Sequence, residues 1–214
     1  EHGNWGLDLS LPTCWAGFLP EWLEILRRDY NHPAIIGWCP LNETWNKQDK
    51  QFVEMLYDMT KAYDPYRMFI DCSGWFHVKT EIMDEHNGDP DPVHFREYYA
   101  PLEEGKEPSE KHWYTGVQAP ASTTFISEYG GIALALDEGA WSYGTVPKNE
   151  EEFLTRLKGL TDVLLDNKGI SACCYIQLTD VEQEQNGLYY YDRRPKLDPA
   201  LIYPIFSRKA AIED

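Results

Sequence analysis

The sequence predicts an α/β fold built on a parallel sheet, because short apolar segments alternate with amphipathic helical segments along its 214 residues. The strand candidates are short and rich in β-branched or other apolar residues. They lie at about 34–39, 68–71, 81–84, 123–127 and 171–178. Five such units are too few to close an eight-stranded barrel, which needs roughly 250 residues. The pattern is therefore typical of a portion of a barrel or of an open α/β sheet.

Helical patterns separate these strands. We expect helices from Pro20 to Tyr30, from Asp49 to Tyr63 and from Glu150 to Leu165, each with apolar residues repeating every three or four positions. Pro20 suits the first turn of the first helix, and a closing helix is expected between residues 192 and 212. The segment from 92 to 121 is long and polar, so we expect it to be functional or to contain minor elements.

The charge of the chain excludes some partners. The formal net charge is −17, and a negative field of this size repels phosphate backbones and anionic lipids. We therefore expect neither nucleic acid nor membrane as a partner. No Gly-x-Gly-x-x-Gly motif and no P-loop occur, which argues against nucleotide binding.

The five cysteines are scattered, and most lie inside apolar runs. Buried free thiols are favoured over a disulfide or metal framework, and no Cys-x-x-Cys pair indicates zinc. We expect no metal site. The first residues have neither a basic nor an apolar segment of the kind found in signal peptides, and no apolar run approaches the ~20 residues that cross a bilayer. The sequence does not distinguish a cytoplasmic from a periplasmic location.

Two glutamates stand out by position. Glu43 follows the apolar run that ends at Cys39, and Glu128 follows the run that ends at Ser127. In a parallel β/α architecture the carboxyl ends of the strands face the active site, so two acidic residues at such ends can converge. Glycoside hydrolysis uses a pair of this kind, in which one carboxyl protonates the leaving oxygen and the other attacks the anomeric carbon. An isolated glutamate at a strand end is more often simply solvated or ion-paired, so the surrounding motifs decide.

The segments around both glutamates resemble glycoside hydrolase family 2, which includes β-galactosidases, β-glucuronidases and β-mannosidases. The stretch 31–38 followed by Asn42-Glu43 resembles that family's strand-4 signature, and Ile126-Ser127-Glu128-Tyr129-Gly130 resembles its strand-7 signature. The segments 177–188 and 192–196 resemble the end of its barrel. The resemblance covers nearly the whole chain. It implies a partial (β/α)8 TIM barrel that comprises strands 4–8 with their helices.

The resemblance also implies roles for individual residues. Glu43 would be the general acid/base and Glu128 the nucleophile of a retaining mechanism, which needs no metal or organic cofactor. Asn42 would bind the sugar 2-hydroxyl, with a turn-capping role as the alternative. His86 would bind sugar, although a lone histidine is as often structural. Many members place a tyrosine just beyond that histidine, where this chain has Gly88, so the tyrosine partner of the nucleophile is unassigned.

An aromatic platform for the sugar is also expected from the resemblance. Tyr175 is the nearest candidate on the last strand, and Trp141 and Trp113 on loops compete with it.

The substrate is expected to be a neutral β-glycoside, as in β-galactosidases. β-Glucuronidases bind the substrate carboxylate through an Asn-x-Lys motif just before the glycine of the segment matching Asn186-Gly187-Leu188. Here Glu184-Gln185-Asn186 precedes that glycine, so the lysine is missing and an acid is present.

The family's barrel begins with three further β/α units, usually preceded by β-sandwich domains, and none of these is in residues 1–214. We therefore expect a fragment of a larger hydrolase whose sheet edges, at strands 4 and 8, can pair with another copy. Two alternatives to an exo-acting β-glycosidase remain. One is an endo-acting glycanase of another family with a related barrel. The other is an inactive fragment that binds sugar weakly at best.

Overall fold

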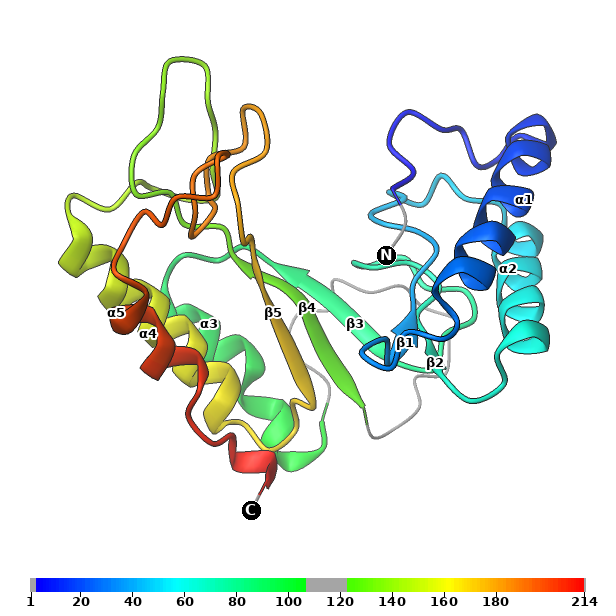
Figure 1. Cartoon of the computed structure of the whole chain (residues 1–214). Helices are drawn as coiled ribbons and strands as arrows, with labels where there is room; N and C mark the ends of the chain where they lie inside the picture. Colours follow the sequence, from blue (N-terminus) through cyan, green and yellow to red (C-terminus); the bar gives the residue numbers. More distant parts are fainter. Residues whose placement is uncertain (1–2, 107–122, 214) are drawn as a thin grey trace. The chain divides into compact units, whose positions relative to one another are not determined.

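The computed structural model describes residues 3–106 and 123–213, which form two compact units (Figure 1). The first unit comprises residues 3–85 together with residue 123, and the second comprises residues 86–106 and 124–213. Strand β3 (Met83–Asn87) runs through the boundary at residue 85. The two units are described separately below.

The first unit places two helices beside a pair of short parallel strands (Figure 1). Helices α1 (Pro12–Asp29) and α2 (Lys50–Tyr63) pack against each other. Strands β1 (Gly37–Trp38) and β2 (Met68–Phe69) pair in parallel, with Gly37 opposite Met68. The parallel pairing of the segments near 37 and 68 is the one that the sequence predicts.

Aromatic residues fill the core of the first unit. The Trp22 indole Nε1–H donates to Thr60 Oγ1 at 2.8 Å, which joins α1 to α2. Trp22 also meets Trp38 of β1 edge to face, with ring centroids 6.2 Å apart. Because a buried indole finds a hydrogen-bond partner here, its large apolar area can be buried without an unpaired donor.

Helix α1 begins eight residues earlier than the sequence predicts. The prediction placed Pro20 in the first turn, but Pro12 occupies that position and Pro20 lies inside the helix. The apolar stripe continues through it, since Phe18, Trp22 and Leu26 are all buried at a four-residue spacing. Packing of that stripe therefore outweighs the cost of a proline within the helix.

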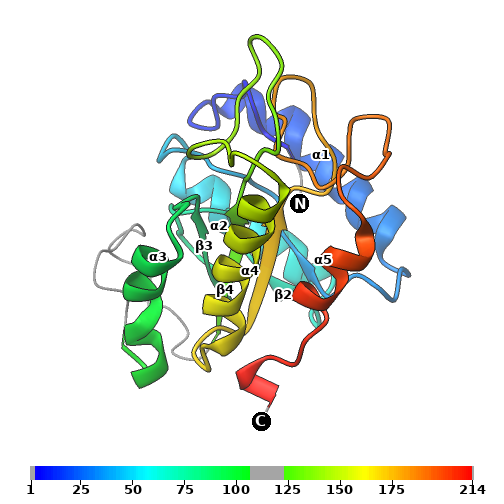
Figure 2. The ribbon, with the colours of Figure 1, turned by 90° about the vertical axis from the view of Figure 1, so that its left-hand side faces the viewer.

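The second unit holds a three-stranded sheet in the order β3-β4-β5, with its helices on one face (Figures 1 and 2). Strands β4 (Thr124–Gly130) and β5 (Ala172–Ile176) are parallel, and their register shifts between Ile126 and Tyr129. Figure 2 shows α4 crossing this face between α3 and α5. The helical elements are α3 (Pro92–Tyr99), η1 (Ala100–Glu104), α4 (Glu150–Asp166), α5 (Pro199–Phe206) and η2 (Ala211–Glu213).

Helices α2 and α4 confirm their predictions to within one residue at each end. Both have a capping side chain at the N-terminus: Asp49 accepts from the Phe52 backbone N–H and Asn149 from that of Glu152. Helix α3 lies in the segment expected to contain minor elements. Residues 107–122 of that segment, including the sugar-platform candidate Trp113, lie outside the described residues.

Strand β4 is longer than predicted and contains Glu128, instead of ending before it. Strand β1 is shorter than the predicted 34–39. Pairing of sheet edges with another copy stays a prediction. In the described part of the chain, no helix is both long enough and apolar enough to cross a membrane.

Candidate active site

In the first unit, the segment carrying Asn42 and Glu43 continues from β1 alongside the residues that follow β2. Asn42 forms an isolated parallel bridge with Ser73, and the Glu43 backbone N–H donates to the Ser73 carbonyl at 2.8 Å. The Ser73 N–H donates in turn to the Leu41 carbonyl at 2.8 Å. The Asn42 N–H also donates to Asn4 Oδ1 at 2.5 Å. The backbone that presents Glu43 is therefore fixed from two sides.

The turn after Asn42 is strained. Glu43, Trp45 and Asn46 all have positive φ, at 41°, 52° and 59°. Each such residue costs roughly 1–2 kcal/mol relative to right-handed backbone. Strain of this kind persists only where surrounding contacts enforce it, and it concentrates at functional sites. The strain therefore supports a functional role for this turn, independently of any motif.

Asn42 carries an unusual buried acceptor. Its side-chain Oδ1 is buried, and no group in the described residues donates a hydrogen bond to it. An unpaired buried acceptor costs about 1–3 kcal/mol. A ligand hydroxyl would satisfy it, as expected for a residue that binds the sugar 2-hydroxyl. A purely turn-capping role would leave the cost uncompensated.

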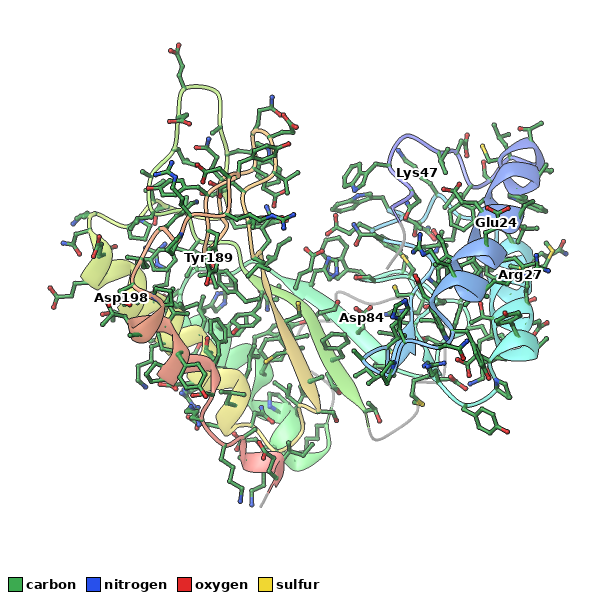
Figure 3. The ribbon with its side chains drawn as sticks, viewed as in Figure 1. Glu24, Arg27, Lys47, Asp84, Tyr189 and Asp198 are labelled. Carbon is green, nitrogen blue, oxygen red and sulfur yellow. The ribbon has the colours of Figure 1, made fainter. Side chains whose placement is uncertain are left out.

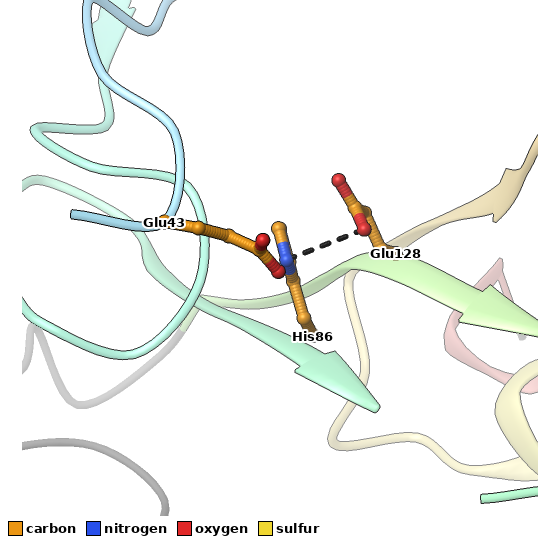
Figure 4. Close-up of side chains that lie close together, drawn as sticks. All are labelled: Glu43, His86 and Glu128. Carbon is orange, nitrogen blue, oxygen red and sulfur yellow. Dashed lines mark ion pairs between the residues drawn. The ribbon is translucent and has the colours of Figure 1, made fainter. Parts of the chain in front are cut away.

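In the second unit, the structure brings His86 and Glu128 together. Nδ1 of His86 on β3 lies 3.4 Å from Oε2 of Glu128 on β4 (Figure 4). The His86 side chain is buried, whereas 18% of the Glu128 side chain is exposed. The register shift between Ile126 and Tyr129 spans Glu128, and an irregularity of this kind re-aims side chains at the edge of a site.

Two glycines lie just after Glu128, and tyrosine rings packed over them leave no space for a side chain at either position. Gly130 has φ +92° and Gly131 has φ +60°, a backbone conformation that favours glycine. A Cβ on Gly130 would lie 2.3 Å from the Tyr175 ring, and a Cβ on Gly131 would lie 1.8 Å from the Tyr143 ring. The Gly-Gly pair thus lets the chain turn sharply next to the candidate nucleophile.

Gly88, where the resemblance would place a tyrosine, is also covered by Tyr143. A Cβ on Gly88 would lie 3.0 Å from Tyr143 Cδ1. The Tyr143 N–H donates to the Gly131 carbonyl at 3.0 Å, which fixes the loop above both glycines. The ring of Tyr143 therefore fills the space that a larger residue at position 88 would need.

The two described candidates for an aromatic platform differ in exposure. Tyr175 packs into the core of the second unit: its ring meets Tyr129 and Phe206 edge to face, and its hydroxyl accepts the Ile132 N–H at 3.2 Å. Burial raises the pKa of Tyr175 well above its usual value. Trp141 is 46% exposed and its backbone pairs with Gln183 and Gln185. Trp141 is therefore the more exposed of the two side chains, and both roles stay predictions.

A buried polar cluster in the first unit was not predicted. Asp71, His77 and Asp84 lie together in the first unit, at the ends of the segments predicted as strands 68–71 and 81–84. The two aspartates carry the signal that singled out Glu43, namely an acid at the end of an apolar run. His77 carries no such signal in the sequence.

The segment 13–154 matches the family model of glycosyl hydrolases family 2, TIM barrel domain. The chain belongs to glycosyl hydrolases family 2. This match covers more than half of the chain and includes Asn42, Glu43, His86 and Glu128. It confirms the resemblance, and the fold is a partial α/β barrel of this family. The alternative of a glycanase from another family is set aside by this result.

Several solved structures resemble this family 2 chain. A Bacteroides uniformis β-glucuronidase has a TM-score of 0.64 and 18% identity over 88% of this chain and 26% of its own. A family 2 β-galacturonidase from Eisenbergiella tayi, bound to galacturonate, has a TM-score of 0.64 and 20% identity over 91% of this chain and 37% of its own. A Dictyoglomus thermophilum β-D-glucuronidase has a TM-score of 0.61 and 17% identity over 93% and 36%.

At these identities the likeness shows the fold alone. The chain spans about a quarter to somewhat more than a third of the length of these enzymes. Among curated proteins, no sequence matches the chain.

Proposed function

We propose that this chain supplies the two catalytic carboxyl groups of a retaining β-glycosidase. The Glu128 carboxylate attacks the anomeric carbon, and the bond to the glycosidic oxygen breaks as that oxygen takes the proton of the Glu43 carboxyl. Glu43 then takes a proton from water, which attacks the glycosyl-Glu128 ester and releases the sugar. The family model carries the proposal, since residues 13–154 include both glutamates.

The local geometry of each glutamate supports its role. Glu43 sits in a strained turn whose backbone is held by hydrogen bonds with Ser73 and with the Asn4 side chain. Glu128 lies beside His86 at a shift in strand register. Asn42 offers a buried acceptor to a sugar hydroxyl. None of these steps requires a metal or an organic cofactor.

A neutral β-glycoside, galactoside-like, is our proposed substrate. Support comes from the segment 184–186, where the Asn186 side-chain N–H donates to the Glu184 carboxylate at 3.0 Å. The nearby Lys196 ammonium is only 5% exposed and donates to Asp180 and to the Gln185 carbonyl. An acid at this position would repel a substrate carboxylate, and this lysine is already held by a buried partner.

We further propose that turnover needs a longer polypeptide that carries this chain, here called the parent enzyme, with the isolated chain at best binding sugar. The proposal is supported by the small share of the compared enzymes that the chain spans.

The two glutamates are tested in the parent enzyme with substrates that differ only in their leaving group. A dinitrophenolate departs without protonation, whereas methanol needs an acid. Glu43→Gln should therefore keep most of its first-step rate on the dinitrophenyl glycoside and lose roughly a thousandfold on the methyl glycoside. Glu128→Gln should lose activity on both substrates. If Glu43→Gln lost the same factor in rate on both substrates, Glu43 would not be the general acid.

The substrate class is tested by comparing nitrophenyl β-galactoside with nitrophenyl β-glucuronide and β-galacturonide. The expected preference is for the neutral sugar, at least tenfold in kcat/KM. A preference for either uronide would overturn the neutral-substrate proposal and leave the two-glutamate mechanism intact.

A further inference from the structure

The first unit contains a pocket that borders Glu43 and that the mechanism above does not use. Its volume is about 560 Å3. Its walls come from residues 4–10 and from the turn after Glu43, and they include Trp5, Asp8, Trp45 and Lys47. Small-molecule sites typically measure about 300–1,000 Å3. The pocket is therefore large enough for a sugar ring.

Two tryptophans in the walls are unusually exposed. Trp5 is 72% exposed and Trp45 is 51% exposed, although indoles are normally among the most buried side chains by area. The first unit buries Trp22 and Trp38 in its core, so exposure is not general to its tryptophans. Exposed indole faces at a pocket suit a ligand with a flat apolar face and a polar edge.

Trp45 is held in place without a ligand. Its ring packs against Trp75 with centroids 4.8 Å apart, and its backbone has φ +52° in the strained turn. Gln48, just beyond this turn, donates its side-chain N–H to the Phe76 carbonyl at 3.0 Å, which ties the turn to the loop that carries Trp75. A platform fixed in this way loses little conformational freedom when a ring stacks on it.

Polar groups stand beside the two indoles. Asp8 accepts hydrogen bonds from the Ser10 backbone N–H at 3.1 Å and from the Ser10 hydroxyl at 2.5 Å. The Lys47 side chain, labelled in Figure 3, follows Trp45 by two residues and also lines the pocket. A carboxylate, a hydroxyl and an ammonium can each bond sugar hydroxyls, whereas a purely apolar ligand would leave them unused.

We propose that this pocket binds the leaving-group sugar, so that the substrate is a β-linked di- or oligosaccharide whose second pyranose stacks on Trp45 and Trp5. This inference rests on the proposed function of Glu43. The acid/base touches the glycosidic oxygen, so a pocket with Glu43 in its wall lies beside either the cleaved sugar or its leaving group. The pocket wall includes Glu43 but not Asn42, which the proposed function places against the cleaved sugar. The leaving group is therefore the occupant.

The test compares pairs of substrates that share the cleaved sugar. Methyl β-galactoside, β-glucoside and β-mannoside lack a second ring, and lactose, cellobiose and β-1,4-mannobiose carry one. In the parent enzyme, Trp45→Ala and Trp5→Ala should lower kcat/KM about tenfold on the disaccharide and less than twofold on the methyl glycoside. Trp45→Phe should recover part of the loss. Tyr66→Ala removes another aromatic of this unit, 86% exposed and outside the pocket walls, and should change neither value.

Equal losses on both members of a pair would overturn the inference, because Trp45 would then act by shaping Glu43. A failure of the proposed function would give a different result. The wild-type enzyme would then hydrolyse neither member of any substrate pair, or Glu43→Gln would be fully active. Glucose binding, followed by ligand-observed NMR, tests the pocket separately. Millimolar binding that Trp45→Ala abolishes supports the site, and no binding to the wild-type enzyme refutes it.

Discussion

Nδ1 of His77 lies 2.7 Å from Oδ1 of Asp71, and both side chains are almost entirely buried. On its other side, His77 Nε2 lies 2.9 Å from the Asp84 carbonyl and 3.4 Å from Asp84 Oδ1. Asp71 also accepts the backbone N–H groups of Val78 and Lys79. His77 thus links the chain after β2 to Asp84 of strand β3. The same strand also carries His86.

The protonated form of His77 should stabilise the fold. Burial alone lowers the pKa of His77, but the hydrogen bond and charge of Asp71 and the charge of Asp84 outweigh burial and raise it to about 9. The usual pKa of a histidine is about 6.5. A raised folded-state pKa gives stability that is complete below about pH 6.5 and is lost as the pH rises through 9.

His77→Ala should therefore lower the free energy of unfolding by about 3–5 kcal/mol at pH 6, because it leaves two carboxyl groups buried without their partner. The difference from wild type should shrink steadily between pH 6.5 and 9.5. Urea unfolding followed by tryptophan fluorescence measures it, since six of the seven described tryptophans lie in the first unit: Trp5, Trp15, Trp22, Trp38, Trp45 and Trp75. If the difference in unfolding free energy between the two proteins did not change with pH, His77 would be neutral in the folded protein.

Asp64 should give the opposite pH dependence in the same unit. Burial raises the pKa of Asp64, but hydrogen bonds from Arg67 and Trp38 and from the backbone N–H groups of Arg67 and Tyr66 outweigh it and lower the pKa to about 2. Arg67 Nη1 lies 2.6 Å and Trp38 Nε1 2.9 Å from Asp64 Oδ2. The stabilisation is therefore complete above about pH 4 and is lost as the pH falls through 2.

Asp64→Ala should cost roughly 3 kcal/mol at pH 6, since it leaves the partly buried Arg67 guanidinium without its carboxylate. The cost should disappear near pH 2. The same urea titration, repeated at pH 6, 4 and 2.5, measures the trend. Asp58→Ala is the control, because its ion pair with Lys79 is exposed and should contribute less than 1 kcal/mol at any pH. A cost that persists unchanged at pH 2.5 would contradict the assignment.

The sequence predicts elements where local chemistry dominates. Asp49 and Asn149 mark helix starts because each side chain caps a backbone N–H three residues on. The start of α1 was wrong because Pro20 has the same local chemistry as Pro12, and only tertiary packing of Phe18 against α2 residues such as Phe52 chooses between them. Local preference could not make that choice.

The candidate site is predictable to a similar depth. Glu43 and Glu128 follow from their motifs, but the positive φ of Glu43 and the register shift at Glu128 depend on contacts distant in sequence. Trp45 stands two residues from Glu43, and nothing in the sequence distinguishes it from the core residue Trp38. Aromatic side chains serve packing and binding equally well, so exposure in the folded chain is what separates them.

Gly131 should tolerate no side chain, and Gly139 serves as its matched control. Both have positive φ, at 60° and 81°, but a Cβ on Gly131 would meet the Tyr143 ring, whereas a Cβ on Gly139 would have nothing within 4 Å. Gly139→Ala should cost about 1 kcal/mol from backbone strain alone. Gly131→Ala should cost roughly 3 kcal/mol or more, because the clash adds to the strain. Thermal unfolding by circular dichroism compares them, and equal costs would mean that Tyr143 moves aside freely.

The contact between His86 and Glu128 should be required for formation of the glycosyl-enzyme. His86 Nδ1 lies 3.4 Å from the Glu128 carboxylate, so His86→Ala removes the side chain that faces the proposed nucleophile and helps to orient it. In the parent enzyme we expect a loss of about 100-fold in the rate at which a 2-fluoroglycoside labels Glu128. His86→Asn places an amide nitrogen near the position of Nδ1 and should recover at least tenfold of that loss. His94→Ala, which removes an exposed histidine paired with Asp89, should label at the wild-type rate.

A merely structural role for His86 predicts a different result. Both His86 variants would then lose thermal stability together, and the labelling rate of the folded fraction would stay near that of the wild type. Mass spectrometry of the labelled peptide, normalised to the folded fraction from circular dichroism, separates the two. Recovery by His86→Asn without recovery of stability would place the effect in the contact with Glu128, because an amide nitrogen can replace Nδ1 beside the carboxylate but cannot restore the packing of the imidazole ring.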